Sequence, residues 1–118
     1  MRKISWLFFI PIFIMTASIS AQKSTIYTHY SKDFNRAVSL FKDAQYASAQ
    51  LIFNKVKEAA TTEELKSDCA YYAANCAIRT NQSNADELME QFVSDYPTSV
   101  KQNQAYIEVA HYHFNQGN

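Results

Sequence analysis

The sequence predicts an all-α fold, and its composition and patterning both support this class. The 118 residues contain one glycine and two prolines, so residues that break helices are almost absent. Apolar residues recur at helical spacing, as in Phe34, Ala37, Val38 and Phe41. Phosphate-binding loops and dinucleotide fingerprints depend on glycine, and the single glycine is Gly117. These glycine-dependent sites are therefore excluded.

The first 21 residues have the layout of a secretory signal peptide. Two basic residues at positions 2 and 3 precede an apolar run over 4–15 and a small, mostly polar tail over 16–21. We expect cleavage after Ala21, so that the mature protein starts at Gln22 in the periplasm and has no membrane span. An uncleaved membrane anchor is the alternative, although the apolar run is shorter than the roughly 20 residues that cross a bilayer.

The charge balance argues against nucleic acid as a partner. The chain has 11 Lys and Arg against 11 Asp and Glu. Loss of residues 1–21 removes two basic residues and leaves a small negative net charge, which gives no basic field for nucleic acid. The chain also lacks a polybasic stripe, so binding to a membrane surface has no electrostatic support.

The mature chain divides into a lead-in and a helical domain. Residues 22–30 are polar and aromatic without a clear period, and we predict that they are irregular. The domain over 31–118 contains N-cap signals at Ser31, at Thr61 with Glu64, and at Ser83. The predicted helices cover approximately residues 31–43, 46–59, 61–80, 83–95 and 99–116. Short turns between them predict antiparallel neighbours.

Packing positions recur between two stretches of this domain. Leu40 and Cys76 each precede an alanine by nine residues, and both alanines precede a large apolar residue by four. The first unit consists of Asp33, Arg36, Ala37, Leu40, Ala49, Phe53 and Thr61, and the second of Cys69, Tyr72, Ala73, Cys76, Ala85, Met89 and Pro97. An incomplete third unit contains Tyr106, Val109, Ala110 and His113.

This pattern resembles the tetratricopeptide repeat (TPR), a helix–turn–helix unit of about 34 residues. The match is clearest in Tyr46-x2-Ala49-x3-Phe53 and in Phe92-x3-Tyr96-Pro97 with the final residues 114–118. With its signal-type start, the chain is similar to exported cell-envelope TPR proteins of Bacteroidetes-type bacteria. The resemblance implies a TPR-like α-solenoid of antiparallel helix pairs, with about two and a half repeats from the N-terminal part of a longer array. A generic helical bundle is the alternative.

The chain also departs from the TPR pattern. Asp33 stands at the usual tryptophan position, and the units are offset by 36 and 37 residues. We expect the last helix to pack Tyr106, Val109 and Ala110 against the preceding helix and to leave Phe114 uncovered.

The resemblance implies a non-catalytic scaffold that binds other proteins of the cell envelope through the concave face of its repeats. The residues that would line this face are Asn35, Val38, Lys42, Tyr71, Ile78, Glu108 and His111. Two alternatives stay open. One is a structural helical module that self-associates, and the other is an uptake protein that binds a small ligand or glycan.

The residues that could carry chemistry have structural explanations. Cys69 and Cys76 are seven residues apart, which on one helix is roughly 10 Å and too far for a disulfide. We expect buried thiols, with intermolecular pairing, metal binding or catalysis as alternatives. His111 and His113 point about 200° apart on a helix, so they do not form a metal pair. We therefore predict no enzyme activity, no metal and no cofactor.

Overall fold

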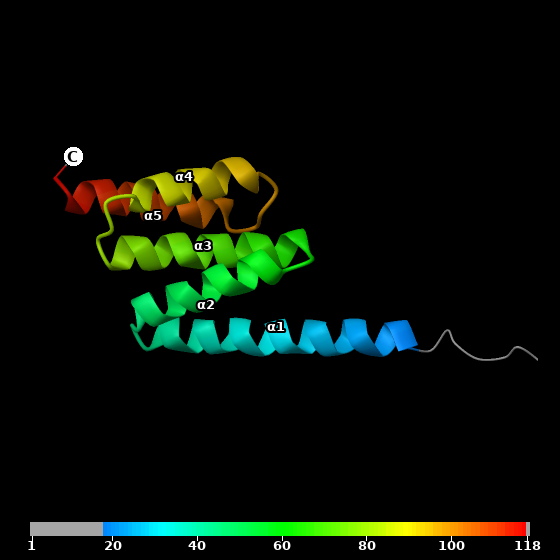
Figure 1. The fold of residues 1–118 in the computed structure, drawn as a ribbon. Coiled ribbons are helices and arrows are strands. Elements are labelled where there is room, and N and C mark those ends of the chain that lie inside the picture. The colour runs from blue at the N-terminus through cyan, green and yellow to red at the C-terminus, as the bar shows by residue number, and fades with distance from the viewer. Residues whose placement is uncertain (1–17, 118) are drawn as a thin grey trace, which may run out of the picture.

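The computed structural model describes residues 18–117, and every regular element in this range is an α-helix. The helices are α1 (Ser18–Lys42), α2 (Tyr46–Ala59), α3 (Glu63–Arg79), α4 (Ala85–Asp95) and α5 (Gln102–Asn115). The predicted all-α class is confirmed. Figure 1 shows α1, α2 and α3 side by side in chain order, with α4 and α5 on the other side of α3.

The first helix is longer than the sequence pattern predicts. Residues 22–30, predicted to be an irregular lead-in, are part of α1, so this prediction is wrong. The segment contains no glycine or proline, and nothing in it prevents the helix of residues 31–42 from extending upstream. The expected cleavage point after Ala21 lies within the same helix. Most of the predicted signal peptide, residues 1–17, lies outside the described residues.

The N-cap of the third helix lies one residue later than expected. The backbone N–H of Leu65 donates to Thr62 Oγ1 at 3.3 Å, so Thr62 and not Thr61 is the N-cap. Glu63 and Glu64 occupy the first turn, where carboxylates interact favourably with the helix dipole. The start of α3 is therefore both capped and acidic.

The chain repeats one turn geometry at the ends of α1, α3 and α5. Ala44, Asn81 and Gly117 all have positive φ values, of 60°, 54° and 78°, which is the left-handed conformation that closes many helices. Each N–H donates to the carbonyl three residues earlier: Ala44 to Phe41 at 3.1 Å, Asn81 to Ile78 at 3.2 Å, and Gly117 to Phe114 at 3.1 Å. The three turns are 37 and 36 residues apart.

An aromatic core joins the first three helices. Phe53 of α2 is fully buried, its ring stacks on Tyr72 of α3 at 5.0 Å, and it meets Phe34 of α1 edge-on at 5.8 Å. Ala37 and Ala49 in the same cluster are also fully buried. Small side chains at these two positions allow α1 and α2 to approach closely, and Phe53 fills the space that the three helices share.

A second core joins α3, α4 and α5. It is formed by Tyr71, Ala74, Met89, Phe92 and Ala105. Positions 36 residues apart are buried to the same extent in the two cores. The pairs are Ala49 with Ala85, Phe53 with Met89, and Val56 with Phe92, none of them more than 1% exposed. Because α3 contributes to both cores, it is the central helix.

The last helix packs through a different side from the one expected. Ala105 of α5 is fully buried, and Val109 packs against the second core. Tyr106 is 59% exposed and Ala110 is exposed, so the prediction that these two pack against α4 is wrong. Ala105 belongs to the second core, so this side of α5 faces α3 and α4. Phe114 is uncovered as expected, at 80% exposed.

Candidate binding groove

Two hollows share lining residues in the first turns of α3. The first, the α1–α3 pocket, has a volume of about 210 Å³, and the second, the α3–α4 pocket, which also includes the connection after α4, has a volume of about 440 Å³. Glu64 and Asp68 line both of them. We call these two hollows together the acidic groove. Its second part is lined by Glu63, Glu64, Ser67, Asp68, Asp95, Tyr96, Pro97, Thr98, Ser99, Val100 and Lys101.

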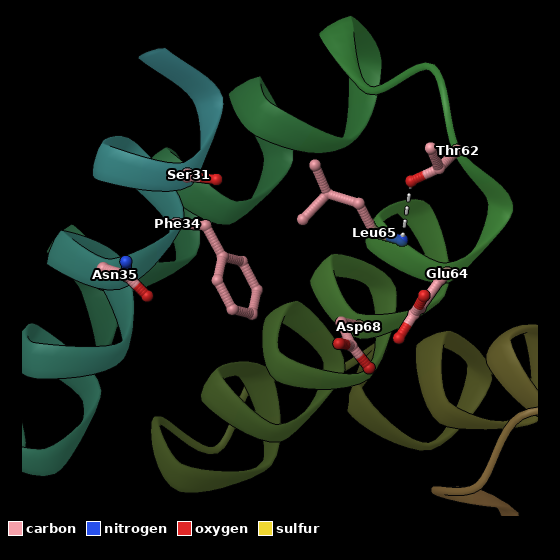
Figure 2. Close-up of a pocket in the computed structure, with 7 residues that line it drawn as sticks. All are labelled: Ser31, Phe34, Asn35, Thr62, Glu64, Leu65 and Asp68. Carbon is pink, nitrogen blue, oxygen red and sulfur yellow. Dashed lines mark hydrogen bonds between the residues drawn. The ribbon is translucent and has the colours of Figure 1, made fainter. Parts of the chain in front are cut away.

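Residues of α1 and α3 face each other across the α1–α3 pocket, as Figure 2 shows. Ser31 and Asn35 lie one turn apart on α1, and Glu64 and Asp68 lie one turn apart on α3. Residues four apart share a helix face, so each helix presents a short polar row to the pocket. The ring of Phe34 lies between the rows and belongs to the first core. The pocket thus has polar walls and an aromatic side chain between them.

The α3–α4 pocket has more acidic than basic side chains among its lining residues. Glu63, Glu64, Asp68 and Asp95 line it, and Lys101 is the cationic side chain among its lining residues. Lys66 forms an exposed ion pair with Glu63 at 3.1 Å, which neutralises part of the rim. Carboxylates gathered in a concave site focus a negative potential, so the groove favours cationic groups.

Lys101 attaches the α4–α5 connection to α3. Its Nζ lies 4.0 Å from Asp68 Oδ1 and above the rings of Tyr72 and Tyr71, at 5.2 and 5.3 Å from their centroids. An ammonium group over aromatic faces is attracted by the negative potential of the rings. The ammonium of Lys101 is therefore a cation of the chain itself that already occupies part of the groove.

The direction of the Asp68 pKa shift indicates that nearby positive charge does not fully compensate its carboxylate. Burial raises the pKa of the Asp68 carboxyl, the Lys101 ammonium lowers it, and Glu64 raises it again. Burial is the largest of these effects, so Lys101 does not fully offset the cost of ionising Asp68. A second cation next to Asp68 would lower this pKa and favour the carboxylate.

The structure places one of the seven predicted partner-binding residues in the groove, namely Asn35. Tyr71 is 3% exposed and Asn75 Nδ2 donates to its hydroxyl at 3.2 Å, so it is a core residue and does not line a surface. Burial also raises the pKa of Tyr71 to about 12. Tyr71 is buried because α4 and α5 both cover this side of α3.

The other five predicted residues are dispersed. Val38 packs against the first core and Ile78 against the second. Lys42 and His111 are exposed and Glu108 is half-buried. None of these five lines the acidic groove.

Sequence reasoning missed the residues that give the groove its charge. Glu64 was assigned only a capping role, and Asp68 follows it by one helical turn, so a row of carboxylates on one face of α3 was visible in the sequence. The position of the Lys101 ammonium cannot be read from the sequence, because only tertiary packing brings the start of α5 over the Tyr72 ring.

The two cysteines are buried free thiols, as predicted. Burial raises the pKa of Cys69 and of Cys76 to about 12, so the nucleophilic thiolate is disfavoured at neutral pH. Among the side chains of residues 30–117, no three or more His, Cys, Asp or Glu come together as metal ligands. No helix within residues 18–117 has both the length and the apolar character to cross a membrane.

Comparison with known proteins gives no relative from which a site could be transferred. No protein-family model matches the chain, and neither the curated proteins nor the solved structures contain a match. The internal spacing and packing of this chain are therefore the basis on which its function is proposed.

Proposed function

We propose that this chain is a non-catalytic protein-binding module of the bacterial cell envelope, built as a TPR-like solenoid. In this proposal the acidic groove binds a basic segment of another protein. The observation that carries the proposal is the groove itself, where carboxylates from α3 and α4 outnumber the ammonium of Lys101.

The repeated packing supports the solenoid part of the proposal. The left-handed turn residue recurs at Ala44, Asn81 and Gly117, and the small residue of the second helix in each pair is fully buried at both Ala49 and Ala85. A repeat protein stacks equivalent units that contact their neighbours. The central position of α3 between two similar cores fits such a stack.

The contacts of Lys101 indicate which chemistry the groove accepts. Its ammonium combines a carboxylate at 4.0 Å with two tyrosine faces at 5.2 and 5.3 Å. A lysine or arginine side chain of a partner would find the remaining carboxylates, Glu64 and Asp95, along the same depression. The cost of ionising Asp68 favours a cationic partner over a neutral one, because the added charge offsets that cost.

A pull-down with charge-matched variants tests the groove. The double variant Glu64→Gln/Asp68→Asn removes two negative charges from the groove, and the control Glu58→Gln/Glu90→Gln removes two from exposed positions on α2 and α4. We expect the wild type and the control to capture the same proteins from envelope extract, with binding that weakens as salt increases. The groove variant should lose them. Equal capture by both double variants would show that the groove is not the binding site.

The envelope location has a separate test. Mass spectrometry of the protein expressed in a diderm bacterium should find a mature N-terminus at Gln22 in the periplasmic fraction. An intact N-terminus in the membrane fraction would contradict export with cleavage and leave the uncleaved anchor.

A further inference from the structure

The two hollows of the acidic groove differ in the charge of their lining residues. The α1–α3 pocket has seven lining residues, all in the described part of the chain. They include Glu64 and Asp68 but no lysine, arginine or histidine. Lys101 lines the α3–α4 pocket and not this one. The α1–α3 pocket is therefore acidic without a basic residue of its own.

The contacts of Lys101 show which environment a cation occupies in this protein. Its ammonium lies 4.0 Å from Asp68 Oδ1 and over the rings of Tyr71 and Tyr72. A carboxylate and an aromatic ring both attract a cation. The α1–α3 pocket offers the same combination, because Asp68 and Glu64 line it together with the ring of Phe34 (Figure 2).

The spacing of the two carboxylates leaves a repulsion that a cation would offset. Glu64 and Asp68 are four residues apart on α3, and like charges at this spacing destabilise a helix. Besides burial, which is the largest effect, the charge of Glu64 raises the pKa of the Asp68 carboxyl. A cation that contacts both carboxylates would therefore bind with the added benefit of removing this repulsion.

The volume of the α1–α3 pocket suits a single side chain. Its volume is about 210 Å³, below the roughly 300–1,000 Å³ of small-molecule sites. Ser31 and Asn35 of α1 form one wall, and the two carboxylates of α3 form the other. Hydroxyl, amide and carboxylate oxygens all accept hydrogen bonds. The occupant therefore finds acceptors on two walls.

A guanidinium uses such a lining more fully than an ammonium does. Arginine has five N–H donors in a planar fork that matches a carboxylate and stacks on aromatic rings, whereas the lysine ammonium is a compact charge with three donors. One guanidinium can therefore donate to both walls of the pocket while its plane packs against the ring of Phe34.

We infer that the α1–α3 pocket is an arginine subsite, which takes one arginine side chain of the basic segment that the acidic groove binds. The inference rests on the proposed function and adds to it the hollow that holds the cation and the basic residue that is preferred. In this subsite Glu64 and Asp68 bind the guanidinium, Ser31 and Asn35 accept hydrogen bonds from it, and Phe34 packs against its face.

Fluorescence anisotropy with two labelled peptides tests the subsite on the full chain. The peptides are hexalysine and the same peptide with one central lysine replaced by arginine. The wild type should bind the arginine peptide at least about fivefold more tightly, because bidentate charge-assisted hydrogen bonds are stronger than those of a point charge. Both affinities should fall as salt increases.

Three variants distinguish the subsite from a general effect of charge. Ser31→Arg places a guanidinium of the chain itself at the pocket, so it should weaken binding of the arginine peptide at least about tenfold and abolish the preference for arginine. Ser48→Arg is the matched control, because Ser48 is exposed on α2 and lines neither hollow; it should keep the preference. Asn35→Ala removes one acceptor without changing the charge and should reduce the preference about threefold.

The outcomes separate the subsite from the proposed function. If the wild type binds neither peptide more tightly than Glu64→Gln/Asp68→Asn does, the groove and the subsite are both wrong. If the groove variant loses both peptides but the wild type binds the two equally, or Ser31→Arg and Ser48→Arg behave alike, the groove stands and the arginine subsite is wrong. Circular dichroism identifies a variant that has lost its helices, and if Ser31→Arg does so, an unchanged preference in Asn35→Ala refutes the subsite.

Discussion

Helices α3 and α5 are similar in length but very different in burial. Of the 17 residues of α3, eight are buried, whereas α5 buries only Ala105 among its 14. The difference does not come from side-chain size, because α5 carries Tyr106, Ile107 and Phe114 where the core positions of α3 are mostly alanine and cysteine. Helix α3 packs against α2 on one side and against α4 and α5 on the other, whereas α5 packs mainly against α4 and α3. The extent to which these two helices are buried therefore depends on their neighbouring helices and not on the size of their side chains.

The largest effect should come from the core that α3 shares with α2. Phe53→Ala removes a fully buried ring that stacks on Tyr72, and we expect it to lower the free energy of unfolding by about 3–5 kcal/mol. Urea unfolding followed by circular dichroism measures this. Leu51→Ala, at a 73% exposed position of the same helix, should change it by less than about 0.5 kcal/mol. Similar losses in both variants would contradict the assigned core.

Hydrogen exchange compares the two helices directly. Amides over 69–77 of α3 should exchange at least about a hundredfold more slowly than those over 106–114 of α5, because local opening of a helix with few buried contacts costs less free energy. The measurement is made at a concentration where the chain is monomeric. Equal protection of the two segments would show that burial does not control local stability here.

Alkaline pH should destabilise the α3 cores through the buried thiols. The pKa of Cys69 and of Cys76 rises from 9.0 to about 12 on burial, so the unfolded chain loses these protons first as pH increases. The stability that the protonated thiols contribute is fully present below about pH 9 and is lost as the pH rises towards 12. Urea unfolding at several pH values should show a shallower decline for Cys69→Ala than for the wild type. If the free energy of unfolding declines with pH as steeply in Cys69→Ala as in the wild type, the Cys69 thiol does not contribute to the decline.

Overpacking tests the equivalence of the two helix pairs. Ala49→Leu and Ala85→Leu each add volume at a fully buried position and should cost about 1–3 kcal/mol. Ala47→Leu, at an exposed position of α2, is the control and should be nearly neutral. If Ala49→Leu and Ala85→Leu both unfold together with the wild type, the proposed repeat register is wrong.

The smallest effect concerns the contact between α3 and the start of α5. Lys101→Met removes a partly exposed ion pair and two cation–π contacts, and should lower stability by about 0.5–1 kcal/mol. It should also tighten binding of an oligolysine peptide, measured by calorimetry, because the internal cation no longer competes. Lys55→Met, at an exposed position on α2, controls for the loss of charge. Weaker peptide binding by Lys101→Met would count against a cation-binding groove.

The sequence by itself determined the helices and much of the core. Apolar periodicity and the scarcity of glycine and proline located α2 at its observed bounds, Tyr46–Ala59, and the small residues Ala49 and Ala85 were recognised as packing positions that are now fully buried. These features are local, since helical spacing and side-chain volume depend on neighbouring residues. The caps were less certain because adjacent residues such as Thr61 and Thr62 offer the same chemistry.

Tertiary structure alone decided which faces are covered and where the groove lies. The sequence predicts Tyr71 on the partner-binding face and Tyr106 packed against the preceding helix, yet Tyr71 is buried and Tyr106 is 59% exposed. Lys101 reaches Asp68 over 33 residues of sequence, and no local pattern indicates that distance in space. The physical reason is that burial and electrostatic pairing depend on the rotation of each helix in the stack. That rotation depends on which side of each helix packs against its neighbours, as the side of α5 with Ala105 does in the second core, and not on the helix itself.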